Sequence, residues 1–273
     1  MSERIVIFTD LDGTLLDHCT YSYKEAEKAL ESIRRKNIPL IVCSSKTREE
    51  IEIYRKKLLN NGPFISENGG AIFIPEQYEG LKCKFDKIVN NYLVIEIGTE
   101  YKTLLDTFEK IRSKTGIDAK SINEFTVDEI LQLTGLSKEE AVLAKKRDYT
   151  LPFIINGGEK EAKSIKNEIL SSGFNYTEGA RFMHLMGAND KGKAVKILAD
   201  IYQANQPGVK ISTAGIGDSL NDLPMLEVVD RPFLVKKESG NYDVRIKAKG
   251  LVYADGIGPI GWNMAILGLL DRH

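Results

Sequence analysis

Two aspartates follow the first apolar stretch of the chain. Residues 5–9 (IVIFT) are mostly apolar and β-branched, and they run directly into Asp10, Asp12 and Gly13. Such a run predicts a strand that is buried on both faces. Because Asp10 and Asp12 are two positions apart, an extended backbone would point both carboxylates the same way, and Gly13 would let the chain turn sharply. Both acids would then lie at the carboxyl end of a buried strand, where open α/β sheets bind ligands.

Paired carboxylates at such a position indicate phosphoryl chemistry. Two nearby negative charges need a cation between them or a shared proton at neutral pH. Ligands that offer only oxygen favour a hard ion such as Mg²⁺. A carboxylate can also attack phosphorus and form an aspartyl-phosphate. A bare Asp-x-Asp would more often be an acidic turn after a strand, but the full string Asp-Leu-Asp-Gly-Thr-Leu favours a catalytic pair.

A second acidic motif lies in the last third of the chain. Residues 209–222 run from an apolar stretch into GIGDSLND, which places Asp218 at the same expected sheet edge as Asp10. Asp222 comes one helical turn later and can face the same ion. A local alternative is that Ser219 caps a short helix and Asp222 is an acid in its first turn. Because that alternative leaves Asp218 unexplained, the sequence predicts metal binding by Asp218 and by Asp222, the latter through water.

Two further residues could hold a phosphate. Ser44 follows the apolar run 38–43 and offers a hydroxyl near an expected helix N-terminus, which suits a phosphate oxygen. Ser45 is the competing choice, and a plain helix cap is the alternative role. Lys191 stands between a loop and a helix, and a held ammonium there would neutralise the nucleophile and the phosphate. Chemistry alone does not single out Lys191 among the many lysines, but its place in the order of motifs does.

That order resembles the haloacid dehalogenase (HAD) superfamily of phosphotransferases. The four motifs of the superfamily match, in sequence, the Asp10 and Asp12 pair, Ser44, Lys191 and residues 217–222. The resemblance implies that Asp10 attacks phosphorus and that Asp12 acts first as an acid and then as a base. It also implies that Ser44 and Lys191 hold the phosphoryl oxygens.

The same resemblance implies that the cofactor is Mg²⁺. Its ligands would be Asp10, the main-chain carbonyl of Asp12, and the acids of the fourth motif, Asp218 and Asp222. An ion between the nucleophile and a phosphate oxygen would offset the repulsion between them.

These residues need a parallel sheet to bring them together. Apolar runs at residues 38–43, 64–66, 71–74 and 209–214 alternate with segments of helical spacing. The alternation predicts an α/β fold, a Rossmann-like doubly wound parallel sheet. Residues 1–84 and 188–273 are expected to form this core.

The pattern changes between the two halves of the core. Residues 85–187 are more polar and read as an α+β unit, an antiparallel sheet with helices on one face. Residues 92–97 alternate like a half-exposed strand, and residues 174–186 look like a hairpin. We expect this segment to be a cap domain inserted in the core, and it resembles the C2-type cap of the Cof-like, class IIB branch of the superfamily.

Three residues of the insertion could contact a substrate. Arg147 and Arg181 could clamp a carboxylate with two parallel hydrogen bonds. For each of them a surface position or an ion pair is the alternative. His184 alternates with Phe182 on an expected strand, and packing in the domain is the more ordinary role for it.

A narrower resemblance is to the family of mannosyl-3-phosphoglycerate phosphatases, which make the compatible solute mannosylglycerate. It rests on segments along nearly the whole chain: ENGGAI at 67–72, KKRDY at 145–149, PF at 152–153, RFMH at 181–184 and DKGKAV at 190–195. Two departures stand out. The string SSKTR at 44–48 replaces the Thr-Gly-Arg usual in class IIB, and Leu151 stands where a carboxylate is expected.

Other functions stay open at this level. The nearest alternative is a phosphatase of different specificity, acting on glucosyl-3-phosphoglycerate, sucrose-phosphate or many phosphate esters. A sugar-phosphate mutase would share the aspartyl-phosphate but return the phosphoryl group. A silent binding protein would have lost the nucleophile or the acid, and both Asp10 and Asp12 are present.

Composition narrows the partners. The formal net charge is −1, without a basic run, which argues against nucleic acid as a partner and leaves a phosphorylated small molecule. No apolar stretch reaches membrane-spanning length, and strand residues begin at Ile5. The three cysteines are too few and too scattered for a disulfide framework. We expect a cytoplasmic enzyme with reduced thiols, and the sequence leaves its oligomeric state open.

Overall fold

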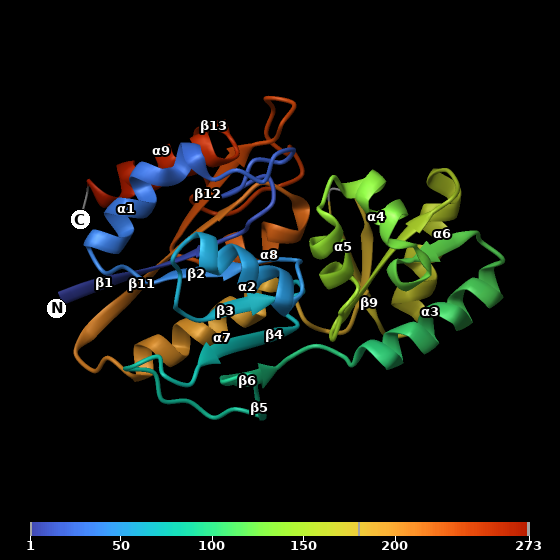
Figure 1. The fold of residues 1–273 in the computed structure, drawn as a ribbon, viewed down its shortest axis with the longest axis horizontal. Helices are drawn as coiled ribbons and strands as arrows, with labels where there is room; N and C mark the ends of the chain where they lie inside the picture. The colour runs from blue at the N-terminus through green and yellow to red at the C-terminus, as the bar shows by residue number, and fades with distance from the viewer. Residues whose placement is uncertain (1, 180, 272–273) are drawn as a thin grey trace.

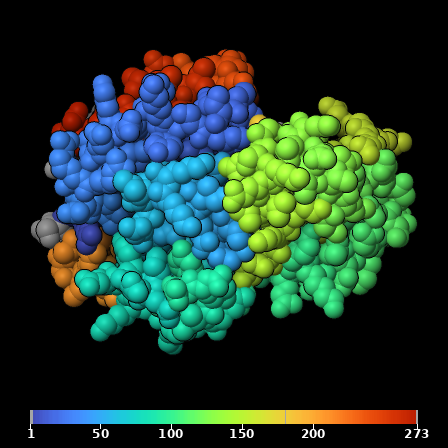
Figure 2. Space-filling view, viewed as in Figure 1, coloured from blue at the N-terminus to red at the C-terminus, as the bar shows by residue number. Residues whose placement is uncertain are grey.

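The computed structural model describes residues 2–179 and 181–271. It has two bodies side by side, a larger one that carries both ends of the described chain and a smaller one made from the middle (Figure 1). In the space-filling view the green and yellow middle segment lies against the blue and cyan part of the larger body (Figure 2). The expected α/β core with an inserted α+β domain is confirmed.

A nine-stranded sheet forms the centre of the core. Its strand order is β13-β12-β11-β1-β2-β3-β4-β6-β5, and the first six of these strands are parallel. The five strands at the centre of this order carry the apolar runs recognised in the sequence. The bounds are β1 (Ser2–Thr9), β2 (Leu40–Cys43), β3 (Phe64–Ser66), β4 (Ala71–Pro75), β5 (Lys87–Val89), β6 (Tyr92–Glu96), β11 (Val209–Gly217), β12 (Arg231–Lys236) and β13 (Val252–Ile257).

Helices cover both faces of this sheet, as a doubly wound fold requires. On one face α1 (Glu27–Arg35), α2 (Arg48–Lys57) and α9 (Pro259–Leu270) pack around the fully buried Trp262. On the other face lie α7 (Lys191–Ala204) and α8 (Leu223–Val228). Because side chains alternate along β1, residues such as Ile5 and Val6 enter opposite clusters, which explains why the run is apolar throughout.

The insertion begins later along the chain than the sequence predicts. Strands β5 and β6 lie inside residues 85–187, yet β6 pairs with β4 of the large sheet and β5 pairs with β6. Assigning residues 92–97 to the cap was therefore wrong. The alternating pattern indicated a half-exposed strand correctly, but an edge region of the core sheet satisfies it as well as a cap sheet does. We propose residues 98–187 as the cap.

The cap is built on a second, antiparallel sheet in the order β7-β8-β10-β9. Its long helices α3 and α6 pack on one face of this sheet, whereas the short helices α4 and α5 form a separate cluster with Phe182 on the other side. The expected helices on one face are thus only part of the arrangement. The bounds are β7 (Ala119–Ser121), β8 (Thr150–Ile155), β9 (Asn175–Glu178), β10 (Met183–Met186), α3 (Tyr101–Thr115), α4 (Val127–Thr134), α5 (Lys138–Ala144) and α6 (Glu159–Ser171).

Among the described residues, no helix combines the length and the hydropathy needed to cross a bilayer. Cys19, Cys43 and Cys83 are all free thiols. Cys43 is fully buried at the end of β2, where it packs as an apolar side chain.

Candidate active site

Neighbouring strands deliver the two acidic motifs to one place. In the pairing of β1 with β11, Thr9 lies opposite Ile216, so Asp10 and Asp218 both follow the strands at the same sheet edge. The Asp10 amide donates to the Ile216 carbonyl at 3.0 Å and extends the pairing by one step. Gly13 then turns the chain with a φ of +78°, a conformation that favours glycine.

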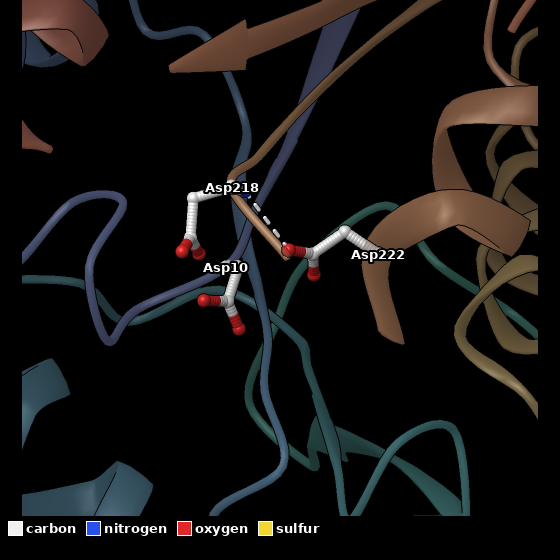
Figure 3. Close-up of side chains that lie close together, drawn as sticks. All are labelled: Asp10, Asp218 and Asp222. Carbon is white, nitrogen blue, oxygen red and sulfur yellow. Dashed lines mark hydrogen bonds between the residues drawn. The ribbon is translucent and has the colours of Figure 1, made fainter. Parts of the chain in front are cut away.

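Three carboxylates converge at this edge (Figure 3). One oxygen from each of Asp10, Asp218 and Asp222 lies within 4.8 Å of the other two, and all three side chains are buried. Burial raises the pKa of Asp10 well above its usual value, and the charges of Asp222 and Asp218 add to this while Lys191 opposes it. Burial and the Asp222 charge likewise raise the pKa of Asp218 to about 6.

Lys191 is the counter-charge inside the cluster. Its ammonium lies 2.6 Å from an oxygen of Asp10 and 2.6 Å from an oxygen of Asp222. Burial alone would lower the pKa of Lys191, but these two carboxylates hold it above its usual value. The motif order in the sequence therefore selected the lysine that the fold brings to Asp10.

The donor set fits a divalent cation. Three buried carboxylates face one ammonium, which leaves net negative charge in a buried space, and oxygen-only donors suit Mg²⁺. The three carboxylates differ in the hydrogen bonds that they accept. Asp222 accepts the amides of Asp218 and Ser219 at 3.0 Å each through the oxygen that does not face Lys191, so it organises the loop. Asp218 instead accepts the side-chain hydroxyls of Thr14 at 3.0 Å and Ser219 at 2.6 Å, which can turn away when an ion binds. Asp10 and Asp218 are therefore the first candidates as ligands.

Asp12 does not share in the carboxylate cluster. Its side chain is the only one of the four expected metal-site residues outside the described three-carboxylate group. It lies 2.9 Å from the ammonium of Lys46 instead. Only the main-chain carbonyl of Asp12, as the resemblance implied, remains a candidate ligand.

The second motif, which contains Ser44 and Ser45, is arranged differently from the expectation that Ser44 faces the phosphate site. Ser44 is buried, and its hydroxyl accepts the Lys46 amide at 3.3 Å. Ser45, the competing choice, lines the cavity between core and cap, and Ser44 does not. The helix cap that follows is Thr47, which accepts the Glu50 amide, so neither serine has that role.

Lys46 and Glu50 are site residues that sequence reasoning missed. Lys46 is 5% exposed at its side chain, pairs with Asp12, and lies 3.7 Å from Glu50. Its ammonium also lies over the rings of Tyr21 and Tyr54. Burial opposes the charge, but Asp12 and Glu50 keep the pKa of Lys46 raised. The signal was available, because Lys46 falls inside the segment that departs from Thr-Gly-Arg.

The cap contributes the two expected arginines to the same cavity. Arg147 donates to the Ser45 carbonyl at 2.6 Å and lies 3.6 Å from Glu50. Arg181 donates to the Tyr21 hydroxyl at 3.2 Å. Among the described residues no carboxylate lies within 4.0 Å of the Arg181 guanidinium. Both arginines line the cavity, so neither is simply a surface side chain.

His184 also reaches this cavity, although packing was the expected role. It is 5% exposed and lies on β10, with Pro152 and Thr177 as its partners on the flanking strands. Pro152 lines the cavity with it. Leu151, which stands where the narrower resemblance expects a carboxylate, is fully buried in the cluster under α3 and α6. It does not line the cavity, so this departure from the family leaves the cavity lining unchanged.

Glu67 joins the core to the cap, a role that sequence reasoning missed. It sits in the turn between β3 and β4 with a φ of 48°, and its buried carboxylate accepts the amides of Asp148, Tyr149 and Thr150. The segment that carries Arg147 is thereby held against the core. Burial raises the pKa of Glu67, against the opposing charge of Arg147.

The fold and the four converging motifs define a haloacid dehalogenase-type hydrolase. The family model of haloacid dehalogenase-like hydrolases matches residues 7–250, and the chain belongs to this family. It also superimposes with a TM-score of 0.64 on a solved HAD subclass IIB sugar phosphatase, at 16% identity, with 98% of each chain covered. At that identity the likeness concerns the fold.

Two full-length relatives are much closer in sequence. The chain is 47% identical over 268 residues to a glucosyl-3-phosphoglycerate/mannosyl-3-phosphoglycerate phosphatase from Methanococcoides burtonii, covering 98% of both chains. It is 43% identical over 269 residues to a protein of the same name from Persephonella marina, again covering 98% of both.

Proposed function

We propose that this protein hydrolyses the phosphate ester of glucosyl-3-phosphoglycerate and mannosyl-3-phosphoglycerate. The observation that carries the proposal is one cavity with the Asp10 nucleophile on the core side and Arg147 and Arg181 on the cap side. A sugar-glycerate phosphate has a phosphate for the first and a carboxylate for the second. The sequence favoured the mannosyl substrate, and the names of the relatives support both sugars.

The reaction would proceed in two displacements on phosphorus. The Asp10 carboxylate attacks the phosphorus atom and the ester P–O bond breaks, while Asp12 protonates the leaving glycerate oxygen. Asp12 then takes a proton from water, and the hydroxide attacks the phosphorus of the aspartyl-phosphate. The second P–O bond breaks, which releases phosphate and regenerates Asp10. Lys191 stabilises the charge on the phosphoryl oxygens throughout.

The acidic cluster is suited to Mg²⁺ as cofactor. Asp10, Asp218 and the main-chain carbonyl of Asp12 would hold the ion, and Asp222 would keep the loop and Lys191 in position. When bound, such an ion neutralises charge between the carboxylates and the phosphate. The raised pKa values of Asp10 and Asp218 support this, because an adjacent cation would stabilise the charged forms that burial, and then the neighbouring carboxylates, disfavour.

The cap must move during the cycle. The cavity measures about 100 Å³, which is far below the roughly 300–1,000 Å³ of typical ligand sites. Hydrogen bonds close it, such as Tyr54 to Glu140 at 2.7 Å and Tyr21 to the Thr134 carbonyl at 2.9 Å. Opening would admit the substrate, and closing would exclude water from the leaving group.

Phosphate release tests the proposal. With Mg²⁺ present, the purified protein should release phosphate from both glycosyl-3-phosphoglycerates much faster than from 3-phosphoglycerate, sucrose-phosphate or p-nitrophenyl phosphate. Chelation by EDTA should stop the release, and added Mg²⁺ should restore it. Equal release from all esters would support the mechanism but contradict the proposed substrate specificity. Isomerised substrate without free phosphate would indicate a mutase, and no reaction would refute the phosphatase.

The same preparation addresses the cellular setting. We propose a cytoplasmic location, which fits three free thiols and a small phosphorylated substrate. Cell fractionation with an antibody to the protein checks it.

A further inference from the structure

His184 has an unusual environment for a histidine. It is 5% exposed, it lines the cavity between core and cap, and it stands on the face of β10 opposite Met183 and Leu185, which pack against the cap helices. A histidine that merely filled space there would be expected to bond through its ring nitrogens.

Neither ring nitrogen does so among the residues that the structure describes. The buried Nδ1 has no hydrogen-bond partner, and no described residue forms a hydrogen bond with Nε2. Gly179 is the neighbour on the Nε2 side, where a Cβ would lie 3.4 Å from that nitrogen, so the glycine leaves room beside it. An orphaned polar atom in a buried site costs free energy unless a ligand pairs with it.

The charge state of His184 narrows the ligand. Burial, with the charges of Arg147 and Lys191, lowers the pKa of His184 to about 3, so the imidazole is neutral at physiological pH. A neutral imidazole offers one donor and one acceptor, which matches a hydroxyl group. The anionic parts of a glycosyl-3-phosphoglycerate already have cationic partners, Lys191 for the phosphate and the two arginines for the carboxylate.

From this geometry we infer that His184 recognises a hydroxyl of the sugar ring. The inference rests on the proposed function and deepens it by naming the residue that distinguishes a glycosylated substrate from bare 3-phosphoglycerate. The apolar side chains that flank it, Pro152 and Phe182, would pack against the carbon face of the ring. His184 is then a specificity residue, and the chemistry at Asp10 does not depend on it.

A selectivity ratio tests the inference. The quantity is kcat/KM for glucosyl-3-phosphoglycerate divided by kcat/KM for 3-phosphoglycerate. His184→Leu should lower this ratio roughly 10-fold, since a sugar hydroxyl loses its partner. His184→Gln, which keeps one donor and one acceptor, should recover part of the ratio. Met183→Leu is the matched control, because Met183 is adjacent on β10 but faces the cap helices, and it should keep the wild-type ratio.

A binding measurement gives an independent readout. The chain has three histidines, so ring carbon-13 labelling gives a simple NMR spectrum in which the His184 signal is the one lost in His184→Gln. Unphosphorylated glucosylglycerate should shift that signal in the wild type, and glycerate at the same concentration should not.

The outcomes separate the two levels of proposal. If the wild type has no preference for glycosylated substrate, the proposed function fails and the role of His184 fails with it. If the preference exists but His184→Leu keeps it, or lowers activity on both substrates equally, only the role of His184 is overturned. A glycerate-induced shift of the His184 signal would likewise overturn the sugar contact.

Discussion

The core and the cap supply opposite kinds of polar side chain to the same cavity. On the core side the two buried lysines are each paired with carboxylates, Lys191 with Asp10 and Asp222 and Lys46 with Asp12. On the cap side, within the described residues, the Nδ1 of His184 has no hydrogen-bond partner, and Arg181 donates to a hydroxyl and a main-chain carbonyl but faces no carboxylate.

This difference follows from what each half has to do. Phosphoryl transfer needs charges held in position before the substrate arrives, because reorganising them during the reaction would raise the barrier. Recognition of a substrate instead needs groups whose partners come with the ligand. The carboxylate-paired lysines of the core, and the cap residues His184 and Arg181 that have no carboxylate partner among the described residues, therefore divide the cavity into a chemical half and a recognition half. Arg147 is the exception on the cap side, since it lies 3.6 Å from Glu50.

The largest expected effect is on the chemical half. Asp10→Asn removes the nucleophile and should lower kcat by roughly 10⁴-fold or more on every substrate. The variant should fold, because asparagine is nearly isosteric and Lys191 keeps Asp222 as its partner. Phosphate release and circular dichroism, measured side by side, check both statements. Retained turnover on any ester would show that Asp10 is not the nucleophile.

A smaller effect on all substrates is expected at Lys46. Lys46→Met leaves Asp12 without the ammonium that lies 2.9 Å away. Losing one charge-assisted hydrogen bond should lower kcat roughly 10- to 100-fold on glycosyl-3-phosphoglycerates and p-nitrophenyl phosphate alike. Lys46→Arg keeps the charge and should retain most of the activity. A loss confined to the glycosylated substrates would instead move Lys46 to the recognition half.

Part of the chemical half could be predicted from the sequence, because Asp10 and Asp218 each follow an apolar strand, whereas Lys191 was selected only by the order of motifs and Lys46 was missed. Asp10 and Asp218 end β1 and β11, whose parallel pairing is implied by the doubly wound pattern. Which side chain of a motif faces the cavity was harder to predict from the sequence. Nothing in the order of residues says that Ser45 rather than Ser44 lines the cavity, or that the Asp12 carboxylate turns to Lys46.

The recognition half was much less predictable, for a physical reason. Its residues come from four places in the cap, and only the packing of that domain on the core brings them together. Arg147 was found because its motif resembled a known family. Glu67 opens the ENGGAI string of the same resemblance, but nothing in that string indicates that its carboxylate holds the Arg147 segment through three main-chain amides. The start of the cap was misplaced for a similar reason, because the alternating pattern of β6 does not indicate which sheet the strand joins.

Substitutions of Arg147 and Arg181 test the recognition half on the cap side. Arg147→Met and Arg181→Met each remove a cation that we assign to the glycerate carboxylate. Each should lower kcat/KM for the glycosyl-3-phosphoglycerates, relative to p-nitrophenyl phosphate, roughly 10- to 100-fold. The ratio cancels any general loss in the chemical half. Arg147 donates to the Ser45 carbonyl of the core at 2.6 Å and lies 3.6 Å from Glu50, whereas the hydrogen bonds of Arg181 to the core are longer, at 3.2 and 3.5 Å. A larger loss of melting temperature is therefore expected for Arg147→Met.

The smallest effect concerns stability and distinguishes a neutral cap group from the charged core groups. The pKa of His184 is lowered from 6.5 to about 3, first by burial and then by the charges of Arg147 and Lys191. Between those values the unfolded chain binds a proton that the folded chain does not, so stability is lost as the pH falls below 6.5. Acidification from pH 7 to pH 5 should lower the free energy of unfolding by about 2 kcal/mol through this residue.

His184→Gln removes that contribution. The variant should therefore gain about 2 kcal/mol relative to the wild type between pH 7 and pH 5, as measured by urea denaturation at each pH. Met183→Leu, on the same strand, should follow the wild-type pH dependence. Parallel curves for His184→Gln and the wild type would mean that His184 takes up a proton in the folded state. The recognition half would then hold a charge of its own, and the contrast between a charged core and a neutral cap ligand would be lost at this residue.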